Sequence, residues 1–206
     1  MSRRAQTLLH IGAQAFRCGS LAWLAMTAAL VLFVFGFPIA AGQQALDLGG
    51  SPKDPLKETP GKVVVLVFVR TDCPISNRYA PLLQEMSVKY GSGAAFWLVF
   101  PDKNESPENI RSYLHEFNYK LPALRDTEHS LVKKGGAKVT PEVAVFNLKR
   151  ELVYHGRIDD LYREFGKARR AATKHELADA IEAASKGVPP PSPVAEGVGC
   201  FISDLK

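Results

Sequence analysis

The stretch "KVVVLVFVRTDCPISNRYAP", residues 62–81, gives the clearest indication of how this chain folds. Its first part, residues 62–69, is β-branched and apolar without polar alternation, which is typical of a central strand covered on both faces. The sequence then turns polar, and Cys73 and Pro74 stand directly before a segment, residues 74–90, whose apolar positions suit a helix. The stretch therefore predicts a strand followed by a helix, with Cys73 in the turn between them.

The same alternation of strands and helices continues along the chain. Residues 94–100 repeat the apolar pattern of the first strand and complete a β-α-β unit. The remaining predicted elements are a helix with Ser106 as N-cap and Pro107 as first residue, a short helical stretch after residues 121–126, a hairpin of strands 142–148 and 151–158, and a last helix starting at Thr173, whose spacing to Glu176 suits a capping box. This order predicts an α/β domain.

An uncharged segment near the N-terminus predicts export. Residues 18–42 carry no charge and follow Arg3, Arg4 and Arg17. Residues 1–42 are therefore either a signal peptide cleaved after Gly42 or a signal anchor, because residues 18–41, at about 1.5 Å per helical residue, are long enough to cross about 30 Å of hydrocarbon. In both cases the positive-inside rule places the rest of the chain outside the cytoplasm, in the periplasm or secreted, where conditions are oxidising.

Composition predicts the domain boundaries and excludes some function classes. We expect a Pro/Gly-rich linker at 43–61, a folded domain at 62–188, and a Pro/Gly-rich tail at 189–206 that carries Cys200. The formal net charge of +5 comes partly from the N-terminal arginines, and no basic face with interleaved aromatics indicates nucleic-acid binding. The five histidines show no metal-ligand spacing, so we expect neither a metal nor another cofactor.

Three features carry a resemblance to a known family. Cys73 stands between the first strand and its helix, Pro81 follows eight positions later, and "VTPEV", residues 139–143, precedes the hairpin. In this order they resemble the thioredoxin-fold superfamily, specifically the redoxin or peroxiredoxin-like group of alkyl hydroperoxide reductases and thiol-specific antioxidant proteins. The resemblance covers about residues 62–187. It implies a thioredoxin-like fold, with a central mixed sheet flanked by helices.

The resemblance also implies a redox function. Cys73 takes the place of the family's nucleophilic cysteine, and Thr140–Pro141 that of the cis-proline loop, which can pair with an extended substrate chain. The implied activity is that of a thiol-disulfide oxidoreductase or a peroxiredoxin-like antioxidant enzyme. Its partners would be a protein thiol or disulfide, or a peroxide, together with an external thiol reductant.

The position of Cys73 gives an independent reason for reactivity. A helix N-terminus supplies partial positive charge and unpaired N–H groups that favour a thiolate, and Pro74 suits the first helical position. Arg70 adds positive potential nearby, while Asp72 opposes it. The alternative is that Cys73 only fills buried space, as free cysteines commonly do.

Departures from the family patterns leave the reaction open. Ser76 stands where thioredoxins have their second cysteine, so no disulfide can form within the Cys73–Ser76 motif. Arg70 stands where typical peroxiredoxins have the threonine that positions peroxide, with Thr71 one residue too late. A copper site of the CxxxC type would need a cysteine at Asn77. Disulfide exchange and peroxide reduction therefore both remain possible.

The tail offers a second cysteine. Its last part is apolar again around Cys200, so the tail can reach back and resolve a sulfenic acid or mixed disulfide on Cys73, from the same or another subunit. Alternatively, Cys200 is an unpaired surface or tail-docking residue. The competing hypothesis for the whole chain is a non-catalytic, membrane-tethered thioredoxin-fold binding module.

Overall fold

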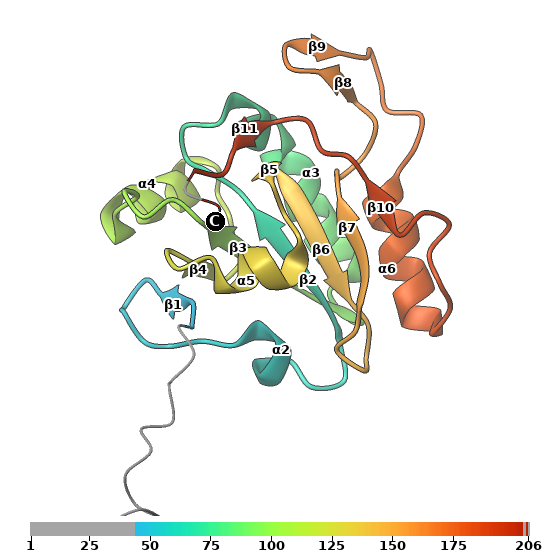
Figure 1. Ribbon diagram of the computed structural model, residues 1–206, viewed down its shortest axis with the longest axis horizontal. Coiled ribbons are helices and arrows are strands. Elements are labelled where there is room, and N and C mark those ends of the chain that lie inside the picture. Colours follow the sequence, from blue (N-terminus) through green and yellow to red (C-terminus); the bar gives the residue numbers. More distant parts are fainter. Residues whose placement is uncertain (1–43, 204, 206) are drawn as a thin grey trace, which may run out of the picture. The chain divides into compact units, whose positions relative to one another are not determined.

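The computed structural model describes residues 44–203 and residue 205, and in these residues one mixed seven-stranded sheet forms the centre of the fold (Figure 1). The strands, in order across the sheet, are β1 (Leu46–Asp47), β4 (Ala123–Arg125), β3 (Ala94–Phe100), β2 (Val63–Phe68), β6 (Glu142–Phe146), β7 (Leu152–Gly156) and β10 (Val194–Ala195). β2, β3 and β4 run parallel, and β6 runs antiparallel to both β2 and β7. The predicted β-α-β unit and hairpin are thus confirmed.

Two further strand pairs and five helices complete the described part of the chain. The pairs are β5 (Val139–Thr140) with β11 (Cys200–Phe201), and β8 (Tyr162–Glu164) with β9 (Lys167–Ala168). The helices are α2 (Pro55–Glu58), α3 (Pro74–Tyr90), α4 (Pro107–Glu116), α5 (Ser130–Gly135) and α6 (Glu176–Lys186). Ser106 caps α4 as predicted, since its hydroxyl accepts a 3.1 Å hydrogen bond from the Asn109 N–H.

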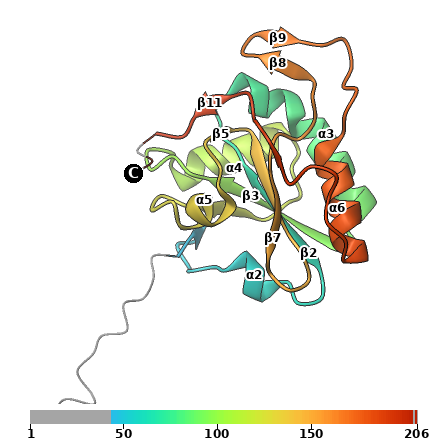
Figure 2. The same ribbon diagram turned by 45° about the vertical axis from the view of Figure 1, so that its right-hand side comes forward.

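β2 is buried on both faces, as its uninterrupted apolar sequence predicts. Alternate residues point to opposite sides. Val63, Val65 and Val67 pack in one apolar cluster with residues of α3, α4 and α6, whereas Leu66 belongs to a second cluster with residues of α5. The sheet is therefore covered by helices on both sides (Figure 2).

The residues of α3 that were predicted to face inward differ in how deeply they are buried. Leu83 and Met86 are buried, while Leu82 and Tyr90 are half-buried and pack against the same cluster. Pro81 lies inside the helix, at the position expected from the resemblance. The helix begins directly after Cys73, which is its N-cap.

Residues 44–61 belong to the folded unit, which corrects their interpretation as a linker. β1 pairs antiparallel with β4, and Ala45 is buried in the second cluster. Asp47 accepts hydrogen bonds from Gly49 and Ser51, and Asp54 caps α2. The same glycines, prolines and acidic residues that suggest a linker here form tight turns against the sheet.

Two further boundaries differ from prediction. The tail after residue 188 is also part of the compact unit, because β10 pairs with β7 and β11 with β5. α6 does not begin at Thr173 with a capping box. Thr173 instead donates its N–H and hydroxyl to Asp160, and Glu176 pairs with Arg157 at 2.5 Å. Asp160 and Arg157, which are distant in the sequence, therefore bind the groups of Thr173 and Glu176 that a capping box would use.

The predicted signal peptide or anchor, residues 1–42, lies outside the described residues, as does Gln43. Within the part of the chain that the structure describes, no helix has the length and apolar character needed to cross a membrane.

Candidate active site

Cys73 lies at the N-terminus of α3 and is fully buried. Its side chain has 0% exposure, and its backbone carbonyl accepts the Asn77 N–H at 3.0 Å as part of the first helical turn. Pro74 occupies the first helical position, as predicted. The sulfur therefore sits at the positive end of a helix of 17 residues.

The loop before β6 brings Thr140 against this sulfur. The Thr140–Pro141 peptide bond is cis, as the resemblance implies. The Cys73 thiol donates a hydrogen bond to the Thr140 carbonyl at 3.1 Å. Cys73 and the backbone of β5, which are far apart in the sequence, thus form one site.

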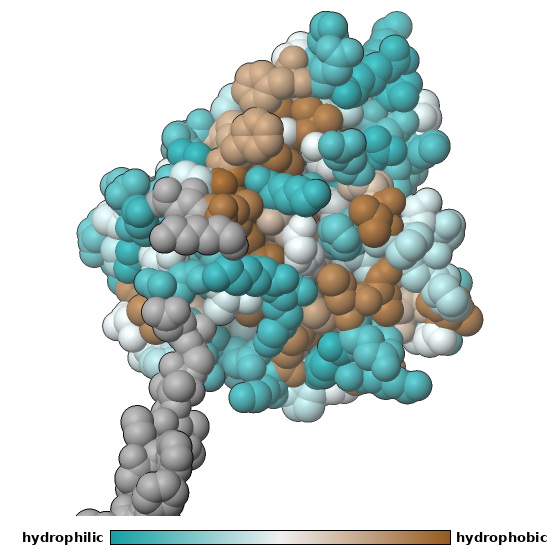
Figure 3. All heavy atoms as spheres, in the orientation of Figure 1, coloured by the Kyte–Doolittle hydropathy of each residue, from teal (hydrophilic) through white to brown (hydrophobic). Residues whose placement is uncertain are grey.

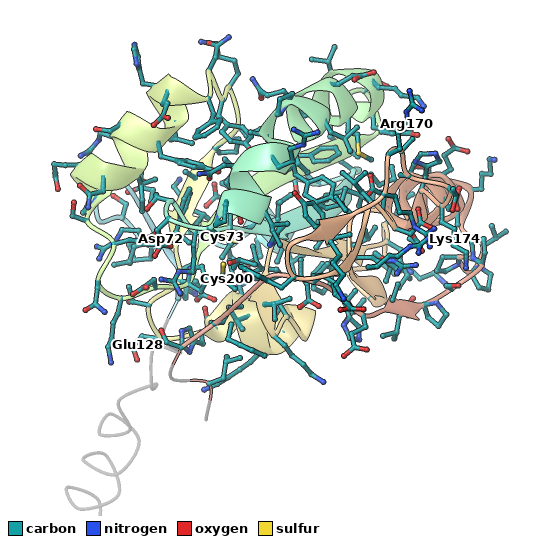
Figure 4. The ribbon with its side chains drawn as sticks, turned by 90° about the horizontal axis from the view of Figure 1, so that it is seen from above. Asp72, Cys73, Glu128, Arg170, Lys174 and Cys200 are labelled. Atoms are coloured by element: carbon teal, nitrogen blue, oxygen red, sulfur yellow. The ribbon has the colours of Figure 1, made fainter. Side chains whose placement is uncertain are left out.

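Cys200 completes the site from the C-terminal tail. β11 runs antiparallel to β5 with Cys200 opposite Thr140, and the Cys200 thiol donates a hydrogen bond to the Cys73 sulfur at 2.9 Å. Both cysteines are free thiols, and they lie next to each other in Figure 4. The prediction that the tail can reach back to Cys73 is therefore met, and both cysteines belong to the same chain.

Several groups outside the cysteines hold the tail in place. The buried Glu142 carboxylate accepts hydrogen bonds from the N–H groups of Lys138 and Val139 on the loop and from Gly197 on the tail. On the other side of Cys200, Ile202 is buried in the second apolar cluster. Sequence reasoning missed Glu142, although its place directly after Pro141 was a signal that it faces the loop.

Arg70 bridges the site to the tail. Its guanidinium pairs with Asp72 at 2.9 Å and Asp102 at 3.3 Å, and it also donates to the Phe201 carbonyl at 3.4 Å. The two carboxylates offset its positive charge. Arg70 therefore acts mainly as a structural link between the turn before Cys73 and β11.

Thr71 and Glu105 fix the same turn from the other side. The Glu105 carboxylate, which is largely buried, accepts both the Thr71 N–H at 2.7 Å and its hydroxyl at 2.8 Å. Burial raises the pKa of Glu105, while these hydrogen bonds oppose the rise. Sequence reasoning missed Glu105, because nothing local links it to Cys73.

The two thiols differ in acidity. Burial acts to raise the pKa of Cys73, but groups that favour its thiolate lower the pKa below its ordinary value: the Cys200 thiol, the Ser76 N–H and hydroxyl, and the Cys200 backbone. Burial and the neighbouring Cys73 raise the pKa of Cys200 to about 12. Cys73 is therefore the thiol that ionises first, and Cys200 is its hydrogen-bond donor.

Replacing Ser76 with alanine will lower the acid dissociation constant of the Cys73 thiol by about tenfold. The Ser76 side chain is fully buried, and its hydroxyl has no hydrogen-bond partner among the described residues, so it is available to donate to the Cys73 thiolate. A hydrogen bond to a charged group contributes about 1.5–3 kcal/mol, and 1.4 kcal/mol corresponds to a factor of ten. Thiolate absorbance in the ultraviolet, titrated against pH, measures the change.

The Ser76→Ala profile should move to higher pH, since the alanine removes a donor that favours the charged form. Ser87→Ala is a suitable control, because the Ser87 hydroxyl donates to the Gln84 carbonyl within α3. An unchanged midpoint in Ser76→Ala would show that the hydroxyl does not act on the sulfur.

The described residues contain no group of three or more histidine, cysteine or acidic side chains that could hold a metal ion. The site as the structure describes it consists of two thiols, backbone groups and hydrogen-bonding side chains.

Comparisons with solved structures give matches over most of the chain. A protein from Sinorhizobium meliloti 1021 is 26% identical, with a TM-score of 0.65 over 77% of this chain and 88% of its own. A conserved protein from Geobacillus kaustophilus is 21% identical, with a TM-score of 0.63 over 81% of this chain and 92% of its own. A secreted disulfide oxidoreductase from Mycobacterium tuberculosis, described as homologous to DsbE of E. coli, is 17% identical, with a TM-score of 0.48 over 70% and 94%. A search of curated proteins gives no match.

The family model named Redoxin matches residues 37–171, which is more than half of the chain. The matched part includes Cys73 and the Thr140–Pro141 loop but ends before Cys200. This match and the mixed sheet flanked by helices confirm the predicted thioredoxin-like fold, and the match supports a thiol-based redox function. The chain therefore belongs to the redoxin family.

Proposed function

We propose that this protein is a thiol-disulfide oxidoreductase in which Cys73 is the nucleophile and Cys200 resolves the intermediate. The observation that carries the proposal is the 2.9 Å contact between the two sulfurs, combined with the lowered pKa of Cys73 and the raised pKa of Cys200. A pair of this kind can exist as two thiols or as one disulfide. It takes the role that a CxxC motif has in thioredoxins.

The reaction balances as two successive exchanges. The Cys73 thiolate attacks a substrate disulfide, forms a mixed disulfide and releases one substrate thiolate. Cys200 then loses its proton and attacks the Cys73 sulfur, which releases the second substrate thiol and leaves a Cys73–Cys200 disulfide. An external dithiol, or two equivalents of a monothiol, returns the pair to the reduced state.

The acidity of Cys200 changes during this cycle. Two of the causes that raise its pKa, the hydrogen bond to Cys73 and the charge of Cys73, disappear once Cys73 is part of a mixed disulfide. Its pKa should therefore fall at the step where it must act as a nucleophile. Cys200 is thus a poor nucleophile in the reduced enzyme and a better one in the intermediate.

The surroundings of Cys73 favour disulfide exchange over peroxide reduction. Arg70, at the position of the peroxiredoxin threonine, pairs with Asp72 and Asp102. The Thr71 hydroxyl donates to Glu105 and is not free to bind a peroxide. Both side chains are therefore engaged in fixing the turn.

We place this activity outside the cytoplasm, in the periplasm or secreted, either after signal cleavage or anchored by residues 18–41. The support is the uncharged N-terminal segment that follows three arginines. An oxidising compartment supplies protein disulfides as substrates and keeps a disulfide between Cys73 and Cys200 stable.

The test uses the full chain with Cys18→Ala, so that Cys73 and Cys200 are the remaining cysteines. After reduction, one equivalent of oxidised glutathione should yield a protein two hydrogens lighter, and Cys200→Ser should stop at a glutathione adduct. Cys73→Ser should give neither product. Oxidation by peroxide but not by the disulfide would indicate a peroxidase, and an unmodified Cys73 under both oxidants would indicate a non-catalytic binding module.

A further inference from the structure

The C-terminal tail pairs as an extended strand with the backbone beside Thr140. In Figures 1 and 2 the segment after β10 crosses the end of the sheet and reaches β5 as β11. Its cysteine faces Cys73, and the Ile202 N–H continues the pairing by donating to the Lys138 carbonyl at 3.0 Å. The tail thus presents a cysteine to Cys73 in the manner of a bound peptide, and it lies beyond the part of the chain that the redoxin family model matches.

The approach of the tail is so close that position 199 must be glycine and position 197 favours it. A Cβ atom on Gly199 would lie 2.0 Å from the Thr140 carbonyl oxygen, which is backbone and cannot move aside like a side chain. A Cβ on Gly197 would lie 2.5 Å from the Glu142 carboxylate that binds the Gly197 N–H. The groove thus selects small residues one and three positions before the cysteine.

The positions after the cysteine have different environments. Ile202, two positions later, is buried in the second apolar cluster. Phe201, between them, is 81% exposed, and hydrophobic side chains gather around β11 on this face (Figure 3). The groove therefore needs an apolar residue two positions after the cysteine and tolerates any residue directly after it.

We propose that the groove along Val139–Thr140 selects segments of the form Gly-x-Gly-Cys-x-aliphatic, and that the chain's own tail is an exchangeable occupant that must leave before such a segment binds. This inference rests on the proposed function, since the bound cysteine is the one that Cys73 attacks. It names the substrate class as a cysteine-containing segment with little side-chain bulk before the cysteine.

The docked tail limits access to the nucleophile. Cys73 is fully buried beside the docked tail, so a polypeptide disulfide reaches it when residues 197–202 leave the groove, and Cys200 resolves the mixed disulfide when they return. β11 has two residues, while β10 upstream remains able to hold the tail on the sheet edge through β7. A tethered occupant also acts at a high effective concentration, so an incoming peptide competes with it.

The experiment uses the full chain with Cys18→Ala and Cys200→Ser, with and without Gly199→Ala. The probe is a synthetic peptide of residues 194–203 whose cysteine forms a mixed disulfide with glutathione. The Cys73 thiolate displaces glutathione and becomes joined to the peptide, with no net oxidation. We expect Gly199→Ala in the protein to accelerate this capture at least about tenfold, because the alanine expels the tail.

A second peptide tests the selection itself. We expect Gly199→Ala in the peptide to slow its capture, at least about tenfold, by the protein variant whose tail has been displaced. Phe201→Ala in the peptide should leave the rate of capture unchanged. Ile202→Ser in the protein provides an independent way to displace the tail if Gly199→Ala impairs folding, and circular dichroism monitors the fold of each variant.

The outcomes separate the inference from the proposed function. Equal capture rates with docked and displaced tails, or equal rates for the glycine and alanine peptides, overturn the inference and leave the thiol chemistry intact. A Cys73 that reacts neither with the peptides nor with oxidised glutathione overturns both.

Discussion

Replacing Cys200 with serine will lengthen the lifetime of a mixed disulfide on Cys73 by at least about a hundredfold. In the native chain the resolving sulfur lies 2.9 Å from the sulfur it attacks and is held there by β11. Groups oriented in this way reach effective concentrations of about 10⁵ M or more, far above the millimolar concentration of an external thiol. Serine preserves the strand and its contacts but removes the nucleophile.

The lifetime is measured by rapid mixing of the reduced protein with oxidised glutathione, followed by acid quenching and intact mass. The protein carries Cys18→Ala throughout, and Cys73→Ser serves as the variant that forms no adduct. Adduct decay at the native rate in Cys200→Ser would mean that another thiol resolves the intermediate. Adding a monothiol should restore decay in proportion to its concentration.

Asp126→Ala will lower the free energy of unfolding by about 2–6 kcal/mol. The Asp126 carboxylate is buried at the start of α5, where it accepts hydrogen bonds from the N–H groups of Ser130, Leu131 and Val132 and from the Ser130 hydroxyl, all between 2.7 and 2.8 Å. Removing the carboxylate leaves at least two buried N–H groups without a partner, at about 1–3 kcal/mol each. That is a large part of a typical total stability of about 5–15 kcal/mol.

Ser130→Ala is the matched control for this prediction. It removes one hydroxyl that donates to the same carboxylate but keeps the three backbone hydrogen bonds, so its cost should stay near 0.5–1.5 kcal/mol, roughly that of one hydrogen bond. Urea unfolding followed by circular dichroism gives both values. A smaller loss in Asp126→Ala than in Ser130→Ala would contradict the role assigned to the carboxylate.

The sequence predicted the central elements of the fold well. The apolar runs at 62–69 and 94–100 became β2 and β3, because a strand buried on both faces needs apolar residues at every position. The turn carrying Cys73 could be located for the same reason, since it must lie between such a strand and the helix after it.

Prediction from sequence failed where the same residue types are found both in linkers and in turns that pack against a sheet. Glycine, proline and aspartate around residues 43–61 suggested a linker, yet the same residue types build the turns that pack β1 and α2 on the sheet. Thr173 and Glu176 had the spacing of a capping box, but Asp160 and Arg157 offered them partners from elsewhere in the chain. A local sequence pattern does not indicate which group from a distant part of the chain will form the hydrogen bond instead.

The candidate site divides in the same way. The position of Cys73 at a helix N-terminus, with Ser76 in place of a second cysteine, could be predicted from the sequence because these features depend on neighbouring residues alone. The contact between Cys200 and Cys73 could not be predicted in this way, since it spans 127 positions and depends on the docking of the tail through Gly199, Glu142 and Ile202. Docking of this kind depends on the shape of a groove, which exists only once the sheet and the loop before β6 have formed.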